Sequence, residues 1–392
     1  GFDINCGVRL CALDLELSQL KDMKKLGRRL KGRIPAGPSG KGGVDLSTTQ
    51  MQTILAEGAK AAAEMGLGYD ADLAAMESNG LLEGDDRRLS ERALKRGALA
   101  LGTLGSGNHF LELQIVDKIV DERAAKAFGL REGQVTAMIH TGSRGLGHQV
   151  CSDHVDLLER RYKQSGDQWH AEAWDITLPD RQLAAAPFHS NEGQAYFEAM
   201  QAAGNYAFAN RSALTQRLRD TLRAHLGTDG ELSVIYDVCH NIAKVEDHVV
   251  HGTSCTCCVH RKGATRALGG DHAELASRFS GIGQPVLVPG DMGTASWVLA
   301  GPQQGMNRAF ASSCHGAGRR MSRGEARRTI DGPALLSELQ EKGITIHANT
   351  PNVLSEEAPD AYKDVDEVIR LTAEAELARP VARLRPFCVI KG

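Results

Sequence analysis

VTAMIHTGSRGLGH, residues 135–148, passes from an apolar, β-branched run directly into a polar turn that contains three glycines. Val, Thr and Ile in such a run are typical of a strand. Glycines in the turn give the backbone conformations that other residues avoid. The pattern predicts a strand that ends in a glycine loop with His140 at the junction, where rigid scaffolds often present functional side chains.

Other segments extend this pattern along the chain. LSVIYDVCH (232–240) predicts a strand, and PVLVPGDMGTASWVL (285–299) predicts two strands joined by a glycine turn. GRIPAGPSGKGGVD (32–45) is typical of a loop. Helical composition covers 13–30, 91–101, 150–164, 191–224 and 324–341. Because strands and helices are interspersed without a regular βαβ rhythm, we predict an α+β fold.

The composition is that of an ordinary globular protein, with 392 residues, 42% hydrophobic and 24% charged. The sequence has no run of about 18 apolar residues and no secretory signal in GFDINCGVRL, so we expect no membrane span and no export. Nine cysteines are too sparse for a disulfide scaffold, which favours reduced thiols and a cytoplasmic location. A net charge of −3 argues against a general nucleic-acid coat protein but leaves room for a local basic cleft.

Four histidines share one sequence setting, because each ends a strand-like run or adjoins glycines: His109, His140, His240 and His315. Asp3 and Cys6 add the spacing D-x-x-C. One such histidine alone is more often structural than a ligand. Together, a thiolate, a carboxylate and several imidazoles suit a borderline divalent metal such as zinc, iron, cobalt or manganese. One cysteine with scattered histidines is unlike structural zinc, and a bridging thiolate would give a binuclear catalytic centre.

Two other motifs have simpler interpretations. The residues Cys255, Cys257, Cys258 and His260 could in principle take zinc, but their alternation predicts a strand with side chains on opposite faces and structural cysteines. Gly40-Lys41 is not a phosphate-binding P-loop, because the preceding glycine spacing is wrong and Gly42 replaces the Ser or Thr that would hold magnesium.

Nine segments, in one order from residue 1 to residue 392, resemble those of the RtcB family of RNA ligases: GFDINCGVRL, GTLGSGNHFLEL, HTGSRGLGHQV, HNIAKVE, HRKGATRA, PVLVPGDMGTASWVLAG, SSCHGAGRRMSR, EEAPDAYKDVDEVI and CVIKG. The resemblance implies one large catalytic domain over 1–392, with mixed β-sheets flanked by helices around a central metal and nucleotide cleft. Relatives have several tens of residues before D-x-x-C, so we expect that the family's N-terminal segment is missing from this sequence.

The resemblance also implies a reaction. RNA ending in a 3′-phosphate or 2′,3′-cyclic phosphate is joined to RNA with a 5′-hydroxyl, with GTP and two Mn²⁺ ions as cofactors. A guanylylated histidine and an RNA-3′-pp-5′-G intermediate carry the reaction, which serves tRNA splicing or RNA repair. The expected partners are RNA, such as tRNA halves, and an archease activator.

Motif positions assign the roles. His315 is the implied nucleophile. One manganese site matches Asp3, Cys6 and His109, and the second matches Cys6, His140 and His240. The implied guanylate contacts are Asn108, His109, Phe110, Leu111, Glu112, His240, Asn241, Pro289, Gly290, Asp291, Met292, Ser296, His315, Gly316, Ala317, Gly318 and Lys391.

Three cations and one carboxylate complete the implied site. Arg144, Lys262 and Arg319 are expected to bind RNA or triphosphate oxygens, with surface salt bridges as the alternative for the arginines. Many relatives have a small hydroxyl residue in place of Asp291, whose carboxylate would repel a triphosphate unless it meets guanine or metal.

Two other functions stay open on sequence alone. A metal-dependent cyclic phosphodiesterase would not need a covalently labelled His315. A non-catalytic RNA-binding protein would not need the metal-type residues together.

Overall fold

An eight-stranded sheet joins strands from both ends of the chain. The computed structural model describes residues 2–227, 231–348 and 351–392. The sheet has the order β11-β12-β15-β2-β3-β1-β7, and β14 pairs with β15. The strands are β1 Gly7–Glu16, β2 Phe110–Ile119, β3 Gln134–Thr141, β7 Leu232–Cys239, β11 Pro285–Val288, β12 Ser296–Ala300, β14 Thr345–Ala348 and β15 Arg379–Lys391. β14 runs parallel to β15 and the other neighbours are antiparallel, so the predicted mixed sheet is confirmed.

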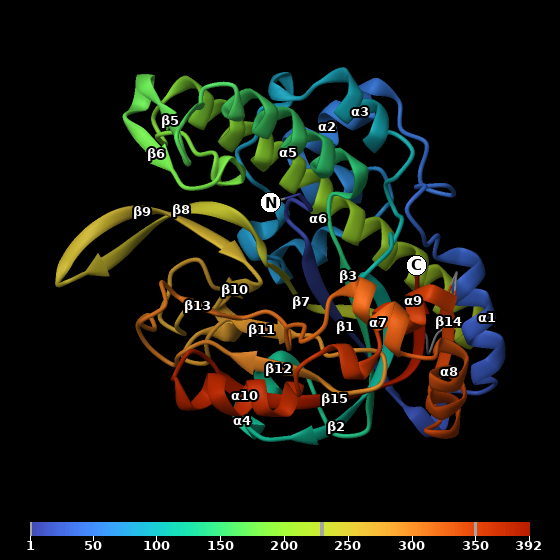
Figure 1. Cartoon of the computed structure of the whole chain (residues 1–392). Helices are drawn as coiled ribbons and strands as arrows, with labels where there is room; N and C mark the ends of the chain where they lie inside the picture. The colour runs from blue at the N-terminus through green and yellow to red at the C-terminus, as the bar shows by residue number, and fades with distance from the viewer. Residues whose placement is uncertain (1, 228–230, 349–350) are drawn as a thin grey trace.

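Helices flank this sheet, as the α+β prediction requires. They are α1 Met23–Arg33, α2 Thr48–Glu64, α3 Glu91–Gly97, α4 Glu122–Phe128, α5 Arg144–Glu159, α6 Asn191–Leu226, α7 Arg323–Thr329, α8 Gly332–Glu341, α9 Pro351–Glu356 and α10 Val365–Glu374. Figure 1 shows α2, α3, α5 and α6 together at the top of the view, α4 and α10 at the bottom, and α1 beside α8 at the right. Along the described residues, no helix combines the length and apolar composition that a membrane crossing needs.

Smaller strand groups lie outside the main sheet. β8 (Asn241–Val250) and β9 (Thr253–Lys262) form a two-stranded ribbon that projects to the left in Figure 1. β10 (Ala264–Arg266) pairs with β13 (Ser312–Cys314), and β4 (Lys163–Ser165), β5 (Gln168–Ala171) and β6 (Ile176–Leu178) form a small three-stranded sheet.

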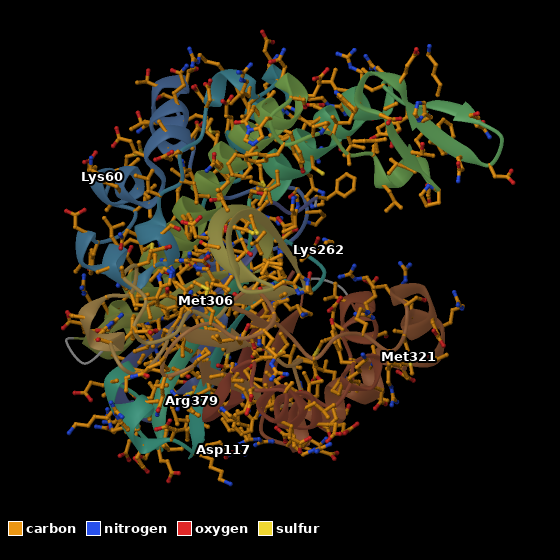
Figure 2. The ribbon with its side chains drawn as sticks, turned by 90° about the vertical axis from the view of Figure 1, so that its left-hand side faces the viewer. Lys60, Asp117, Lys262, Met306, Met321 and Arg379 are labelled. Carbon is orange, nitrogen blue, oxygen red and sulfur yellow. The ribbon has the colours of Figure 1, made fainter. Side chains whose placement is uncertain are left out.

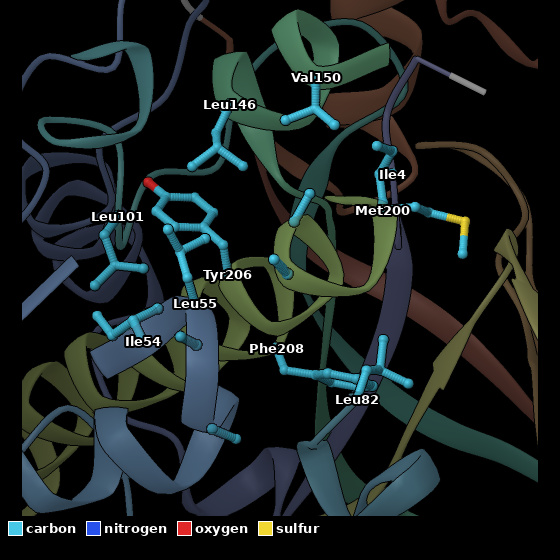
Figure 3. Close-up of a cluster of buried hydrophobic side chains, with 14 of the residues drawn as sticks. Ile4, Ile54, Leu55, Leu82, Leu101, Leu146, Val150, Met200, Tyr206 and Phe208 are labelled. Carbon is cyan, nitrogen blue, oxygen red and sulfur yellow. The ribbon is translucent and has the colours of Figure 1, made fainter. Parts of the chain in front are cut away.

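The long helix α6 supports the sheet from within the upper helical layer. It begins at a Ser190 cap, whose side chain accepts a hydrogen bond from the Gly193 amide. Its middle is rich in alanine and is buried, which lets neighbouring elements approach closely. Tyr206 and Phe208 enter an apolar cluster with α2 and α5 residues that Figure 3 shows in close-up. Polar α6 residues buried beside this cluster position the site described below.

The predicted helix over 13–30 was wrong at its start. Leu13 and Leu15 alternate with Asp14 and Glu16, and this period of two places them at the end of β1. The helix begins only at Met23.

The other predicted elements differ mainly in their bounds. The segment 324–341 is two helices, because the Asp331 side chain accepts from the Ala334 amide and starts α8. The segment 91–101 is helical only to Gly97, and the segment 150–164 begins earlier and ends at Glu159. The strands over 135–140, 232–240 and 285–299 and the helix over 191–224 are confirmed.

Candidate active site

Sheet register brings distant residues to one edge. Cys6 directly precedes β1, and His240 directly follows β7. His140 lies at the end of β3. Because β1 runs antiparallel between β3 and β7, with Gly7 opposite both Thr141 and Cys239, all three side chains meet where β1 begins. His109 directly precedes β2, whose first residue lies opposite His140, so His109 joins the same edge.

The side-chain atoms that could bind a metal lie close to one another. The Cys6 Sγ is 3.3 Å from His109 Nε2 and 3.4 Å from His140 Nε2. His140 Nε2 is 3.2 Å from His240 Nε2, and His109 Nε2 is 2.7 Å from Asp3 Oδ2. Two groups result, Asp3-Cys6-His109 and Cys6-His140-His240, in each of which the donor atoms lie within 4.8 Å. These are the two predicted ligand sets, and they share the Cys6 sulfur.

The residues present fit divalent metal ions. Burial lowers the pKa of His140 and of His240, so both rings are neutral and can offer lone pairs. Two neutral Nε2 atoms in contact can share at most one hydrogen. Asp3 Oδ1 is buried and has no hydrogen-bond partner among the described residues. A cation between these donors would satisfy the unpaired atoms, and the mixed sulfur, nitrogen and oxygen set suits a borderline metal better than magnesium.

A close approach around Asp3 explains one of the glycines. A Cβ atom on Gly142 would lie 2.4 Å from Asp3 Oδ1. Any larger residue would displace the carboxylate from its place beside His109. The HTGSRG motif therefore needs glycine at this position to admit Asp3, which precedes β1 at the same edge of the sheet.

Buried polar residues on α6 hold the loops that carry the ligands. Arg211 Nη1 donates to the carbonyl of Asn5 at 2.9 Å and to that of Thr141 at 3.1 Å, one residue from Cys6 and from His140. Arg211 and Arg9 both donate to the fully buried carboxylate of Asp237 on β7. β1, β3 and β7, which carry or adjoin Cys6, His140 and His240, are thus tied to one helix.

Asn210 performs the same role for the loop before His109. Its side-chain oxygen accepts from the amides of Gly102 and Thr103, and its Nδ2 donates to Gly142 O at 3.0 Å. Sequence reasoning missed Asn210 and Arg211. The sequence pattern that could have indicated them is a pair of polar residues in the otherwise apolar middle of a predicted helix.

His315 lies against the second ligand group. Its ring stacks on that of His240, with centroids 3.4 Å apart and planes 15° apart. The stack arises because β13 ends at Cys314 opposite Ala264, while the neighbouring Thr265 donates to Cys239 O at 2.6 Å. Burial first, and then Lys262, lower the pKa of His315 to about 3, so this imidazole is also neutral.

His315 also lines a cavity. Twelve of the predicted nucleotide- or phosphate-binding residues line it: Asn108, Phe110, Pro289, Gly290, Asp291, Met292, His315, Gly316, Ala317, Gly318, Arg319 and Lys391. His140 lines it as well, so the cavity reaches the metal-type cluster. Lys391 Nζ lies over the Phe110 ring, 5.6 Å from its centroid.

A family model described as tRNA-splicing ligase RtcB matches residues 1–392. The chain belongs to the RtcB family. A protein named tRNA-splicing ligase RtcB from Thermococcus kodakarensis is 48% identical over 397 residues, covering 100% of this chain and 80% of that protein. Its namesake from Archaeoglobus fulgidus is 47% identical, with 100% and 80% covered. A Pyrococcus furiosus protein of the same name is 47% identical over 99% of this chain and 40% of its own length.

Some residues predicted from the RtcB resemblance are not among those that line this cavity in the described structure. Glu112 is buried, and Gln114 bridges it to Ser296 by donating to both at 2.9 and 3.1 Å. Burial raises the pKa of Glu112 to about 8, although Lys391 and Gln114 oppose the rise. Leu111 packs in the apolar core on the other face of β2.

The predicted phosphate-binding cations have different surroundings. Arg144 is only 8% exposed, and its Nη1 lies 3.2 Å from His109 Nδ1. Arg319 contacts Glu357 and Tyr362 at the cavity wall. Lys262 lines a neighbouring cavity together with Asn241, and Figure 2 shows it between the upper helical part and the segment that carries Met321.

The Asp291 carboxylate is hydrogen-bonded within its own loop. Its carboxylate accepts from the amides of Gly293 and Thr294 and from the Thr294 hydroxyl. These bonds hold the turn between β11 and β12. Most of the lone pairs of this carboxylate are therefore used within the loop rather than directed at a nucleotide.

The structure adds four cavity residues to which the RtcB resemblance assigned no role: Gly263, Arg323, Glu357 and Tyr362. Glu357 accepts from Arg323 at 3.1 Å and from the Tyr362 hydroxyl. Glu357 and Tyr362 belong to the EEAPDAYKDVDEVI segment, and its resemblance to the RtcB family could have indicated a role for them.

The cysteine-rich segment remains apart from the site. Cys255, Cys257, Cys258 and His260 lie on β9, as the alternation predicted. Cys258 Sγ is 3.6 Å from His260 Nε2. In the described part of the chain, these four side chains do not form a metal-type group.

Proposed function

We propose that the chain is a GTP- and Mn²⁺-dependent RNA ligase that joins RNA 3′-phosphate or 2′,3′-cyclic phosphate ends to 5′-hydroxyl ends. The supporting observation is the position of His315. It stacks on His240, a member of the Cys6 cluster, and also lines the cavity that Lys391 and the glycine loops enclose. A nucleophile, a phosphate cradle and a metal-type cluster then act on one phosphorus atom.

His315 carries the first transfer. A ring nitrogen attacks the α-phosphorus of GTP, an N–P bond forms, and the bond to the β-phosphate breaks with release of pyrophosphate. A 3′-phosphate oxygen of RNA then attacks the same phosphorus, which frees the imidazole and gives RNA-3′-pp-5′-G. A cyclic phosphate is first opened by water.

The second RNA end completes the reaction. The 5′-hydroxyl oxygen attacks the 3′-phosphorus and loses its proton, and GMP leaves. Two divalent cations held by the groups that share Cys6 would neutralise phosphate oxygens and orient the attacking group. Manganese suits the thiolate and imidazole donors beside a carboxylate.

Other residues select and hold the nucleotide. The glycines of HGAG allow backbone amides to approach phosphate. Lys391 supplies a buried positive charge in the same cavity. Glu112, when ionised, can accept from N1–H and N2–H of guanine, which adenine does not offer, so we propose GTP rather than ATP as donor. By family membership we propose tRNA halves as one substrate and archease as an activator, which turnover with and without archease would test.

Labelling with α-³²P-GTP and Mn²⁺, followed by denaturing electrophoresis, tests the proposal. We expect an acid-labile label on the wild type, none on His315→Ala, and normal labelling of His251→Ala, an exposed histidine on the β8–β9 ribbon. Cleavage of cyclic phosphate without any label would indicate a phosphodiesterase instead. RNA binding that is indifferent to Cys6→Ala, without either activity, would indicate a binding protein.

A further inference from the structure

Helix α1 carries an unusual concentration of positive charge. Its sequence MKKLGRRLKGR has six Lys or Arg in 11 residues and no acidic residue, in a chain whose net charge is −3. All six side chains are exposed. Within residues 2–227, 231–348 and 351–392, none of the six forms an ion pair with a carboxylate: Lys24, Lys25, Arg28, Arg29, Lys31 and Arg33.

Four exposed cations on or at the end of other helices have a different arrangement, although Arg92, Arg123 and Lys126 also lack an ion pair among the described residues. Lys60, Lys95, Lys342 and Arg370 each have a carboxylate three or four residues away on the same helix. Such pairs stabilise a helix, whereas like charges at that spacing destabilise it. The spacings Lys24–Arg28 and Lys25–Arg29 on α1 are of the repulsive kind. Helix stability therefore does not explain these charges. Binding of an external anion would explain them.

The opposite face of α1 is fixed in the protein. Leu26 and Leu30 are fully buried, and a Cβ on Gly27 would lie 2.5 Å from His347 Nε2 on β14. The apolar face is thus unavailable for insertion into a lipid surface, which a membrane-binding amphipathic helix requires. Burial, and then Lys31 and Arg28, lower the pKa of His347, which agrees with a positive potential at this surface. A hydrated polyanion fits the exposed face better than a membrane.

The charged surface extends to the neighbouring helix α6, where Arg29, Arg33 and Arg217 line one hollow together with Asp220. Arg217 on α6 donates to Arg33 O at 3.3 Å and to Gly42 O at 2.8 Å, which extends the surface onto α6. In the loop after α1, the Gly37 amide donates to Gly105 O at 2.7 Å. Gly105 precedes Asn108, which lines the cavity, by three residues. This backbone bond places the loop after α1 next to the segment that leads to Asn108 in the cavity lining.

We propose that the basic face of α1, extended by Arg217, binds the phosphodiester backbone of the RNA substrate at nucleotides remote from the ends being joined. This inference rests on the proposed ligase function. An 11-residue helix is about 16 Å long and so spans several phosphates. Each phosphate that a cation neutralises releases about 0.7 of a counterion from single-stranded nucleic acid, so the contact adds affinity without sequence preference.

The test substitutes side chains that make no hydrogen bond within the described residues: Lys24→Gln, Lys25→Gln, Arg28→Gln and Lys31→Gln in one variant. The control carries Lys60→Gln, Lys95→Gln, Lys342→Gln and Arg370→Gln, which removes the same charge from paired positions. Fluorescence anisotropy measures binding of a labelled tRNA-length RNA at several salt concentrations. Steady-state ligation compares that RNA with an oligonucleotide of a few nucleotides, and far-ultraviolet circular dichroism verifies the fold.

We expect the α1 variant to lower the slope of log affinity against log salt by about 2 to 3, whereas the control changes little. KM for long RNA should rise on the order of tenfold at moderate salt, with kcat and the short substrate unaffected. Equal slopes for the α1 variant and the control would overturn the proposal. Loss of binding to anionic lipid vesicles or acidic peptide, with RNA binding intact, would overturn it in favour of that partner. If the proposed ligase function is wrong, the wild type will join neither RNA. RNA binding by α1 can still be tested in that case, because the anisotropy measurement does not depend on ligation.

Discussion

The His315 ring lies parallel to the His240 ring at 3.4 Å between centroids, so the proposed nucleophile contacts a metal-type residue through its face. Stacking is not ligation. His240 offers Nε2 to the Cys6 cluster, whereas His315 lines the cavity and belongs to neither ligand group. Metal loading and nucleotide transfer should therefore be separable by substitution, although the two rings touch.

The shared sulfur gives the first prediction. Cys6 belongs to both ligand groups, so Cys6→Ala should reduce bound Mn²⁺ from two ions per chain to less than one. His315→Gln should keep both ions while losing guanylylation. Metal analysis after gel filtration measures this, with the more exposed thiol variant Cys257→Ala as control. Two ions retained by Cys6→Ala would rule out the bridging thiolate.

A second prediction concerns a residue that makes no contact with metal or nucleotide. Gly142→Ala places a Cβ 2.4 Å from Asp3 Oδ1 and should displace this ligand. We expect Mn²⁺ affinity at the Asp3-Cys6-His109 site to fall about 10- to 100-fold, as for other changes that disorient ligands. Gly32→Ala is the matched control, because nothing lies within 4 Å of its added Cβ. Isothermal titration with Mn²⁺ compares the two, and equal affinities would show that Asp3 is not a ligand.

Sequence alone could predict the ligand-type residues but not what holds them. His140 and His240 end strands that their β-branched runs identify, and register then explains the convergence with Cys6. Arg211 could not be assigned, because its partners Asn5 and Thr141 are 206 and 70 residues away. Long-range hydrogen bonds of this kind leave no local pattern.

The helix boundary that was predicted wrongly from sequence also depends on contacts between residues far apart in the chain. Strand and helix patterns overlap at the start of residues 13–30, because Leu13 has the strand spacing to Leu15 and the helical spacing to Leu17 and Leu20. Pairing with Leu232 on β7 decides the strand, and that partner is far away in the sequence.

Arg211 provides a stability prediction. Arg211→Met removes two bonds to Asp237 and two to loop carbonyls, all buried, and should lower the free energy of unfolding by about 3 to 5 kcal/mol. Arg379→Met removes a partly exposed pair with Asp121 and should cost about 1 kcal/mol or less. Urea unfolding compares the variants, and similar losses would mean that the buried network does not support the site.

Lys391 separates nucleotide use from metal loading. Its amine lies in the cavity over Phe110, and no ligand-type atom of the Cys6 cluster is its partner among the described residues. Lys391→Met should raise KM for GTP by about tenfold or more, because a charge-assisted contact to phosphate or guanine is lost. Bound Mn²⁺ should stay at the wild-type level. Lys60→Met serves as control, and a parallel loss of metal would show that Lys391 acts on the cluster instead.

Glu112 should make stability depend on pH. Burial raises its pKa to about 8 from the ordinary 4.5, so between these pH values the folded protein holds a proton that the unfolded chain has lost. The contribution of this group to stability is therefore complete below about pH 4.5 and falls as the pH rises toward 8. Glu112→Gln should remove a fall of a few kcal/mol across that window.

Urea unfolding of both proteins at pH 5.5 and pH 8 measures this difference. Burial lowers the pKa of Lys391, which acts in the opposite sense, but wild type and variant both keep that residue. The exposed variant Glu91→Gln should follow the wild type. If Glu112→Gln loses as much stability as the wild type between the two pH values, then Glu112 is already ionised in the folded protein, and its carboxylate is available to guanine without first losing a proton.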